Sequence, residues 1–223
     1  MTVSIHNEFD QKSLEWVQFR CGKITASNVD KILTPTLKIA SNDKERQFLY
    51  ELLGQRITNR VPPQFVSDSM LRGESEEIFA CEMYSERYGA VTPCAFIEND
   101  KLGFPLGYSP DGLVGEDGLI EIKSRSQKFQ VQTLIENKVP EEFVLQIQAG
   151  LMISERKWGH FISYSNGMPL FVLRVEPDPV IFQAIETAVC AFEARISEKL
   201  KVYNENAKRF HMAEWREYEE III

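Results

Sequence analysis

The sequence predicts a single α/β domain, and three observations lead to that prediction. The chain has 223 residues, which suits one ordinary α/β domain or two small ones. Hydrophobic residues make up 43% of the chain, enough for a real core, and no linker-like or low-complexity stretch divides it. Segments that alternate apolar and polar residues, as strands do, occur between segments with apolar residues at helical spacing.

Two helical segments are predicted near the N-terminus. Ser13 can cap a short helix that ends at Gly22, and Thr25 or Ser27 can cap a second helix. Arg20 then lies at the end of one helix and Ser27 at the start of the next. The free N–H groups of a helix start and a forked arginine can together bind phosphate. A capping serine and a surface arginine explain the same pattern, and on the residues alone that explanation is the simpler one.

The remaining elements follow from periodicity, capping residues and turn residues. Pro140 begins one helix, Asn166-Gly167 is a hairpin turn, and Asp178-Pro179 caps a long helix. The apolar tail around Trp215, which ends in residues 221–223, is expected to dock on its own domain or on a neighbouring subunit. Helices are expected over residues 42–58, 69–88, 140–152 and 178–208, and strands over 90–97, 102–108, 119–123, 158–165 and 169–175.

Composition excludes several classes of protein. No apolar run approaches the ~20 residues that a membrane helix needs. The N-terminus has neither a basic segment nor an apolar one, so no secretory signal is visible. The four cysteines form no C-x-x-C pair, which indicates reduced, buried thiols in a cytosolic protein and argues against a structural zinc site. They are Cys21, Cys81, Cys94 and Cys190.

The net charge of −8 argues at first against a nucleic-acid partner, but the acidic residues are unevenly distributed. Residues 61–120 carry three Lys and Arg against eleven Asp and Glu, a net of −8. Residues 1–60 carry nine against seven, a net of +2. The acidic segment can be a metal-binding cluster or a solvated helix face, the latter being the usual explanation. The rest of the chain has enough basic residues to form a local groove for a polyanion.

A β-hairpin is predicted around residues 115–118, which read GEDG and separate two apolar runs. After this turn the residues alternate in character. Ile120 and Ile122 fall on one face of the second strand, while Glu121 and Lys123 fall on the other. The isoleucines are therefore expected to fix the strand in the core.

Folding the hairpin about its turn places Asp111 opposite the segment that holds Glu121 and Lys123. Two carboxylates and an amine then converge at the end of a half-buried strand. That arrangement suits a hard divalent cation next to a water to be activated. The Glu-x-Lys pattern also occurs at residues 136–138 and 155–157, where a solvated ion pair is the ordinary explanation.

Other reaction chemistries lack their motifs. The chain has no P-loop sequence, no G-x-G-x-x-G after a strand and no G-x-S-x-G elbow. The dispersed His6, His160 and His211 are interpreted as surface or strand residues rather than as ligands or bases. Gln146 and Gln148 lie in an apolar run, and one of them can face the site while the other is solvated. What remains is carboxylate–metal chemistry assisted by a lysine.

Four sequence blocks carry a family resemblance. The sequence resembles the phage-lambda-type exonucleases of the YqaJ-like viral recombinase family, within the restriction-endonuclease-like nuclease superfamily. The blocks fall in the family's order at similar spacing, cover roughly residues 10–175, and are individually weak but together fairly specific. They are WVQFRCGKITAS (16–27), MLRGESEE (70–77), SPDGLVGEDGLIEIK (109–123) and LQIQ (145–148).

The resemblance implies roles for these residues in a metal site. Lys123 matches a lysine that positions or deprotonates the attacking water, and Gln146 matches a glutamine that supports the cluster. Oxygen ligands of this kind suit Mg²⁺, with Mn²⁺ able to substitute, rather than zinc. The implied metal ligands are Asp111, Glu121, Glu77 and the backbone carbonyl of Ile122, although Glu77 near a helix start also complements the helix dipole.

The resemblance also implies contacts with the end of the DNA. Arg20 and Ser27 match residues that hold the 5′-phosphate of the degraded strand, and Ser109 is expected to assist them. Met70 falls where the family has an apolar wedge that splits the terminal base pair. A phosphate pocket beyond the cleavage site would explain a preference for ends and cutting in one direction.

The implied fold is a single nuclease domain over residues 1–223, with a restriction-endonuclease-like core whose mixed central β-sheet is flanked by helices. Helices within 13–58 would form the DNA-end pocket and residues 69–175 the catalytic core, followed by the helix at 178–208 and the tail. The implied activity is Mg²⁺-dependent 5′→3′ exonuclease digestion of double-stranded DNA ends, which leaves 3′ tails for recombination.

The family further implies a homotrimeric ring and a partner single-strand annealing protein, in the cytoplasm of a bacterial host, with a phage or prophage origin. Two alternatives stay open. One is a structure-specific or restriction-type endonuclease on the same core. The other is a non-catalytic protein that binds DNA ends.

Overall fold

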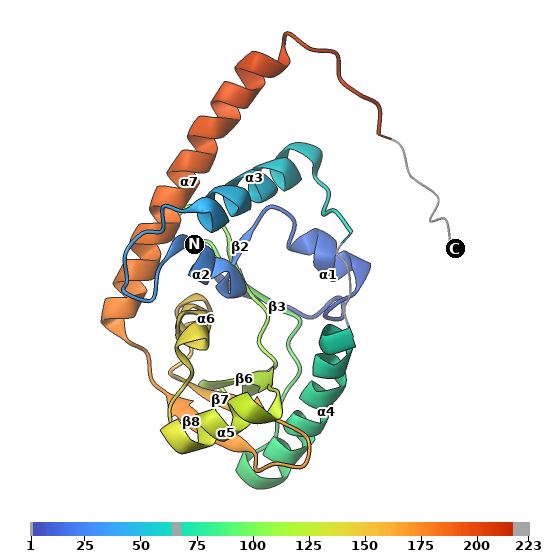
Figure 1. Ribbon diagram of the computed structural model, residues 1–223. Coiled ribbons are helices and arrows are strands. Elements are labelled where there is room, and N and C mark those ends of the chain that lie inside the picture. Colours follow the sequence, from blue (N-terminus) through green and yellow to red (C-terminus); the bar gives the residue numbers. More distant parts are fainter. Residues whose placement is uncertain (1, 64–67, 216–223) are drawn as a thin grey trace.

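The computed structural model describes residues 2–63 and 68–215, with the side chains of 68–70 excepted (Figure 1). Helices and strands alternate along this part of the chain. In chain order, the elements are β1 Val3–His6, α1 Leu14–Phe19, β2 Ile24–Thr25, the 3₁₀ turn η1 Ala26–Asn28, α2 Val29–Ile32, α3 Asp43–Thr58, α4 Asp68–Tyr88, β3 Phe96–Asn99, β4 Leu106–Tyr108, β5 Gly112–Val114, β6 Gly118–Ser124, α5 Gln127–Glu136, α6 Glu141–Ser154, β7 Trp158–Tyr164, β8 Phe171–Val175 and α7 Pro179–Ala207.

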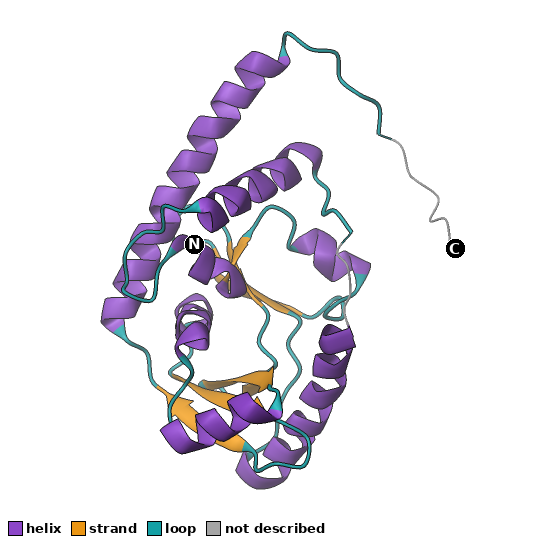
Figure 2. Cartoon of the chain, in the orientation of Figure 1, coloured by secondary structure: helices purple, strands orange, loops and turns teal. Residues whose placement is uncertain are grey.

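The strands form two four-stranded sheets, with the orders β1-β3-β4-β2 and β5-β6-β7-β8. Figure 2 shows the strands in orange among the surrounding helices. Each sheet is mixed, because β2 pairs with β4 in parallel and β6 pairs with β7 in parallel, while the other pairs are antiparallel. The predicted α/β class is confirmed. The strands are, however, divided between two sheets rather than gathered in one central sheet.

Helix α6 packs between the two sheets, and α4 covers the opposite face of the second sheet. Leu119 and Phe161 belong to the main apolar core with α6, whereas Ile120 and Ile122 pack with residues of α4. Strand β6 is therefore covered on both faces. The prediction of a half-buried strand was wrong, because α6 and the first sheet close over the face that carries Glu121.

Several predicted helix starts are confirmed by their caps. The Ser13 hydroxyl accepts the Trp16 N–H at 3.1 Å, and the Asn42 amide oxygen accepts the Glu45 N–H at 2.9 Å. Asp178 accepts the Val180 N–H at 2.8 Å at the start of α7. The second predicted helix begins as η1 and continues as α2, and the side chain of Thr25 makes no capping bond.

Other parts of the fold differ from the prediction. Strand β1 and helix α5 were not predicted, and the strand expected over 90–97 begins only at Phe96. Gln148 is not solvated, since its amide bonds the Glu176 carbonyl and the Asp178 N–H. Of the four cysteines predicted to be buried, only Cys94 is buried; Cys21 and Cys81 are half-buried and Cys190 is exposed. The predicted tail contacts at residues 221–223 lie outside the described residues. No helix within the described ranges is both long enough and apolar enough to cross a membrane.

Candidate active site

The hairpin formed by β5 and β6 brings Asp111 to the edge of β6. Gly112 pairs with Ile120 in the antiparallel register, and the Asp111 N–H donates to the Ile120 carbonyl at 3.2 Å. The Ile122 N–H in turn donates to the Asp111 carboxylate. Backbone groups two residues apart in a strand point to the same side. The Ile122 carbonyl therefore points toward the space beside Asp111, which β5 does not cover because it begins at Gly112.

Glu121 lies next to this edge and is only 2% exposed. Its Oε1 accepts hydrogen bonds from Gln146 Nε2 at 2.5 Å and from Lys123 Nζ at 2.8 Å. Its Oε2 accepts the hydroxyl of Tyr108 at 2.8 Å. The structure thus brings together Asp111, Glu121, Lys123 and Gln146, the four residues that the sequence placed in one cluster.

Tyr108 is a member of this cluster that the sequence analysis missed. It ends β4 in the first sheet, yet its hydroxyl reaches Glu121 in the second sheet. Its ring lies against α6 at Gly150, where an added Cβ would be 2.6 Å from Tyr108 Cζ. The small residue of α6 lets the ring approach, so packing of α6 on β4 determines where the hydroxyl lies. Only the position of Tyr108 directly before the SPDG block could have suggested its role.

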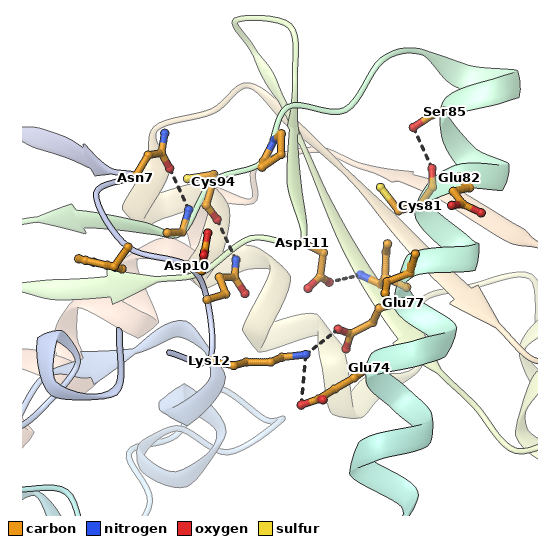
Figure 3. Close-up of a pocket in the computed structure, with 16 residues that line it drawn as sticks. Asn7, Asp10, Lys12, Glu74, Glu77, Cys81, Glu82, Ser85, Cys94 and Asp111 are labelled. Atoms are coloured by element: carbon orange, nitrogen blue, oxygen red, sulfur yellow. Dashed lines mark hydrogen bonds and ion pairs between the residues drawn. The ribbon is translucent and has the colours of Figure 1, made fainter. Parts of the chain in front are cut away.

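Glu77 projects from α4 into an open cleft of about 830 Å³, which Asp111 and Ile122 also line (Figure 3). Its carboxylate is 3.2 Å from the ammonium group of Lys12, which is also 3.4 Å from Glu74. Glu121 does not line this cleft. Lys12 was not predicted as a site residue, and no motif identifies it.

The acidic groups of the cluster repel one another. Burial raises the pKa of Asp111 well above its usual range, and the Glu121 and Glu77 carboxylates raise it further, while Lys123 acts in the opposite direction. Burial alone would lower the pKa of Lys123, but Glu121 and Asp111 outweigh it, so the net shift is upward. Lys123 is therefore an ammonium donor near neutral pH, and a second cation near Asp111 would relieve the remaining repulsion.

The chemistry of these donors fits a hard divalent cation. Carboxylate oxygens and a backbone carbonyl are the ligands that Mg²⁺ and Mn²⁺ prefer. Across residues 2–63 and 68–215, no three His, Cys, Asp or Glu side chains are grouped so as to hold a metal. Glu77 pairs with Lys12, and both oxygens of Glu121 accept hydrogen bonds within the protein.

A second polar cluster surrounds Arg20. Its guanidinium is 3.3 Å from the Ser109 hydroxyl, 3.4 Å from the Thr25 hydroxyl and 4.1 Å from the centroid of the Trp16 ring. The Thr25 and Ser27 hydroxyls are 3.1 Å apart. The structure therefore brings Arg20, Ser27 and Ser109 together, as the sequence analysis expected. Thr25 and Trp16 are additional members that it did not assign to the site.

Burial lowers the pKa of Arg20 to about 10, and no carboxylate among the described residues pairs with it. Four residues of this cluster, namely Trp16, Arg20, Thr25 and Ser27, line an open pocket of about 720 Å³, whereas Ser109 does not. Ser109 instead connects the two clusters along the chain, because it precedes Asp111 by two residues. Trp16 Nε1 donates to the Ser109 hydroxyl at 3.0 Å and holds it in place.

The wedge expected at Met70 is a different case. Met70 lies in the first turn of α4, but its side chain is outside the described residues. Its predicted role stays a prediction.

The structure is therefore an α/β protein whose clustered carboxylates form a candidate metal site suited to hydrolysis. The family model for the YqaJ-like viral recombinase domain matches residues 15–157. The chain therefore belongs to the YqaJ-like viral recombinase family, and the predicted resemblance is confirmed. A search of the curated proteins found no match.

Solved structures agree with this assignment. The alkaline exonuclease LHK-Exo from Laribacter hongkongensis is 30% identical, with a TM-score of 0.78 over 88% of this chain and 99% of that one. Its complex with dAMP gives 31% identity and a TM-score of 0.80 over 89% and 100%. A phage-related exonuclease from Haemophilus somnus 129PT is 12% identical, with a TM-score of 0.55 over 84% and 96%, and shows the fold alone. The relatives support a nuclease role and a restriction-endonuclease-like fold.

Proposed function

We propose that this protein is a Mg²⁺-dependent 5′→3′ exonuclease that degrades one strand of double-stranded DNA from its ends and leaves 3′ single-stranded tails. One observation carries the proposal. Ser109, which contacts Arg20 of the cationic pocket, lies two residues from Asp111 of the carboxylate cluster. An enzyme that recognises a strand end and hydrolyses a nearby bond needs these two features close together.

The metal would be held by Asp111, Glu121, the Ile122 carbonyl and Glu77. When bound, it would activate a water and neutralise charge on the phosphate in the transition state. The side chains of the protein have separate tasks. Lys123 orients the attacking water through its ammonium group, while Gln146 and Tyr108 hold the Glu121 carboxylate in place.

Arg20 is proposed to bind the 5′-phosphate of the strand being degraded, with Ser27 and Ser109 as hydrogen-bond donors. Arginine presents forked N–H donors that match a phosphate, and the neutral surroundings of Arg20 leave its charge available. Met70 is proposed as the wedge that separates the terminal base pair.

The family assignment also underlies a proposal about assembly. We propose that three chains form a ring around the DNA and that an annealing protein binds the 3′ tail. Processivity would then come from the closed ring, since the sequence has no ATPase motif. The proposed setting is the cytoplasm of a bacterial host, with a phage or prophage origin.

Digestion of a linear duplex labelled separately on each strand tests the proposed function. With Mg²⁺, we expect mononucleotide release from the 5′-phosphorylated strand only, and with EDTA no release. Release from the 3′ end would overturn the direction. Cleavage of covalently closed circular DNA would instead support the endonuclease alternative. Binding of DNA ends without any Mg²⁺-dependent release would support the non-catalytic alternative.

A further inference from the structure

A third polar pocket, of about 530 Å³, opens at the start of α5 and is called here the α5 pocket. Arg72 reaches it from α4, and Arg125 and Lys128 reach it from the end of β6 and the start of α5. Ser165 and Asn166 line it from the turn between β7 and β8. None of these residues belongs to the carboxylate cluster or to the pocket around Arg20.

Arg125 is the central residue of this pocket and is only 9% exposed. Its Nη1 pairs with Glu142, and its guanidinium carbon lies 4.9 Å and 5.1 Å from the ring centroids of Phe129 and Phe143. Its Nε is buried and has no hydrogen-bond partner among the described residues. A buried donor without an acceptor is unusual in proteins, because its lost hydration is not replaced. Glu142 and the two rings thus hold the guanidinium in a fixed position at the wall of the pocket.

The first turn of α5 adds positive potential at the same place. A helix start exposes N–H groups and the positive end of the helix dipole, and acidic residues normally complement it. This ten-residue helix has no acidic residue in its first turn, and the side chain of its N-cap residue, Ser126, makes no capping bond. Lys128 lies in that turn instead. The local charge therefore favours an anion.

The balance of charge within the α5 pocket is also positive. Arg72, Arg125 and Lys128 line it together with one carboxylate, that of Glu76. Glu76 accepts the Ser124 hydroxyl and is 3.9 Å from Arg72, so it is already engaged. Glu142 pairs with Arg125 but is 62% exposed, so solvent weakens its hold on the guanidinium.

We propose that the α5 pocket binds a backbone phosphate of the DNA substrate, at a position other than the 5′ end. The proposal rests on the proposed function, because it takes DNA as the substrate. Its location supports it. Arg125 follows Lys123 by two residues, which in an extended chain is a separation of roughly 7 Å. Along the chain, Ser109, which contacts Arg20, precedes the residues of the carboxylate cluster on the hairpin, and Arg125 follows them directly after β6.

The test uses the charge variants Arg72→Ala and Lys128→Ala, singly and together, and Arg125→Lys, which keeps the charge but removes the fork. Lys201→Ala, an exposed lysine of α7, is the matched control. Fluorescence anisotropy measures binding of a blunt duplex in EDTA, over a range of salt concentrations, with 5′-phosphate and with 5′-hydroxyl ends. Thermal melting verifies that each variant is folded.

We expect a less steep dependence of the DNA association constant on salt in the double variant. The slope of its logarithm against the logarithm of salt concentration should shrink in magnitude by about 0.9 for each DNA phosphate that the protein no longer neutralises. Affinity should fall roughly tenfold or more, equally for both kinds of end, since this pocket does not read the 5′-phosphate. Arg125→Lys should give a smaller fall in affinity with an unchanged salt slope, because the charge is kept and only the forked donor is lost. The Lys201→Ala control should bind like the wild type.

An unchanged slope and affinity in a folded double variant would overturn the proposal. So would a reduction confined to 5′-phosphorylated ends, because that would assign these residues to end recognition. Calorimetry with inorganic phosphate separates a free-anion site from a DNA site: phosphate binding that the double variant abolishes, with DNA binding unaffected, also overturns it. All these measurements are made without Mg²⁺. A negative nuclease assay would therefore refute the proposed function, while the binding measurements would still test whether the α5 pocket binds DNA phosphate.

Discussion

The carboxylate cluster and the pocket around Arg20 both contain buried charged groups, but the surroundings of those groups are opposite in kind. In the first, Glu121 is surrounded by donors, namely Tyr108, Gln146 and Lys123, but Asp111 remains in an excess of negative charge. In the second, Arg20 is surrounded by neutral hydroxyls and an indole ring. The first region has more negative than positive charge, and in the second no carboxylate among the described residues pairs with the arginine.

This difference indicates what each region is for. A protein selected only for stability would pair a buried arginine with a carboxylate, because an unpaired buried charge is costly. Here the two unbalanced regions are joined by the short segment from Ser109 to Asp111 and do not neutralise each other. Their deficits match the two things a DNA exonuclease must bind near one bond, a divalent cation and a phosphate.

The largest expected effect comes from Asp111→Asn. Removing this carboxylate should lower DNA hydrolysis at least about 10³-fold, equivalent to about 4 kcal/mol of transition-state stabilisation, while leaving duplex binding in EDTA largely intact. The matched control is Asp117→Asn in the turn of the same hairpin, whose carboxylate pairs with Lys157. Retained hydrolysis in Asp111→Asn would remove this carboxylate from the proposed mechanism.

The same variant should also be more stable without metal. The pKa of Asp111 is raised above its usual value of 3.8, so the stability linked to its protonation is present below that value and is lost as pH rises through the folded pKa. At neutral pH, asparagine relieves this repulsion. Each 1 kcal/mol relieved should raise the melting temperature by about 2–4 °C. A lower melting temperature in EDTA would contradict the electrostatic account of the cluster.

Arg20→Ala tests the second region, the pocket around Arg20, and should have an intermediate effect on the choice of DNA end. Hydrogen bonds to a charged group contribute about 1.5–3 kcal/mol, so the preference for 5′-phosphorylated over 5′-hydroxyl ends should fall about 10–100-fold. Rates on both substrates, measured in parallel, give this ratio. Arg46→Ala, which removes an exposed arginine of α3, should leave the ratio unchanged. A ratio unaffected by Arg20→Ala would refute the phosphate-binding role.

The sharpest contrast is expected between two glutamines of α6, one of which should have no effect on activity. Gln146→Ala should lower activity about 10–100-fold with little change in stability, because Gln146 supports the Glu121 carboxylate. Gln148→Ala should leave activity unchanged but cost about 1–3 kcal/mol, because Gln148 bonds two backbone groups before α7. Melting curves and rate measurements on both variants would separate the roles, and exchanged outcomes would contradict this assignment.

The hairpin shows how much of the site could be predicted from sequence. The alternation of residues 120–123 and the turn at 115–118 determine the position of Asp111 relative to Glu121, so local rules were sufficient there. The same rules could not reveal that the Glu121 face is buried, because the elements that cover it, β4 and α6, are distant in sequence. Tyr108 and Lys12 were missed for that reason, since each reaches its partner only through tertiary packing.

The fold was predicted to a similar extent. Long elements with clear caps, such as α3 and α7, were located closely, because their caps and apolar stripes are local. Helix α5 was missed because its first turn has no acidic residue to mark a helix start. The division into two sheets was not predicted either, since strand pairing depends on contacts between distant segments.

Gly150 has a consequence for how relatives of this protein diverge. Its missing side chain is what admits the Tyr108 ring, and hence the hydroxyl that holds Glu121. A chain that kept every acid and lysine of the hairpin but acquired a methyl group at position 150 would still match the family's motifs, yet its tyrosine could not remain in place. We therefore expect positions 108 and 150 to be inherited as a pair. Where they separate, an intact motif would conceal an enzyme that has drifted out of function.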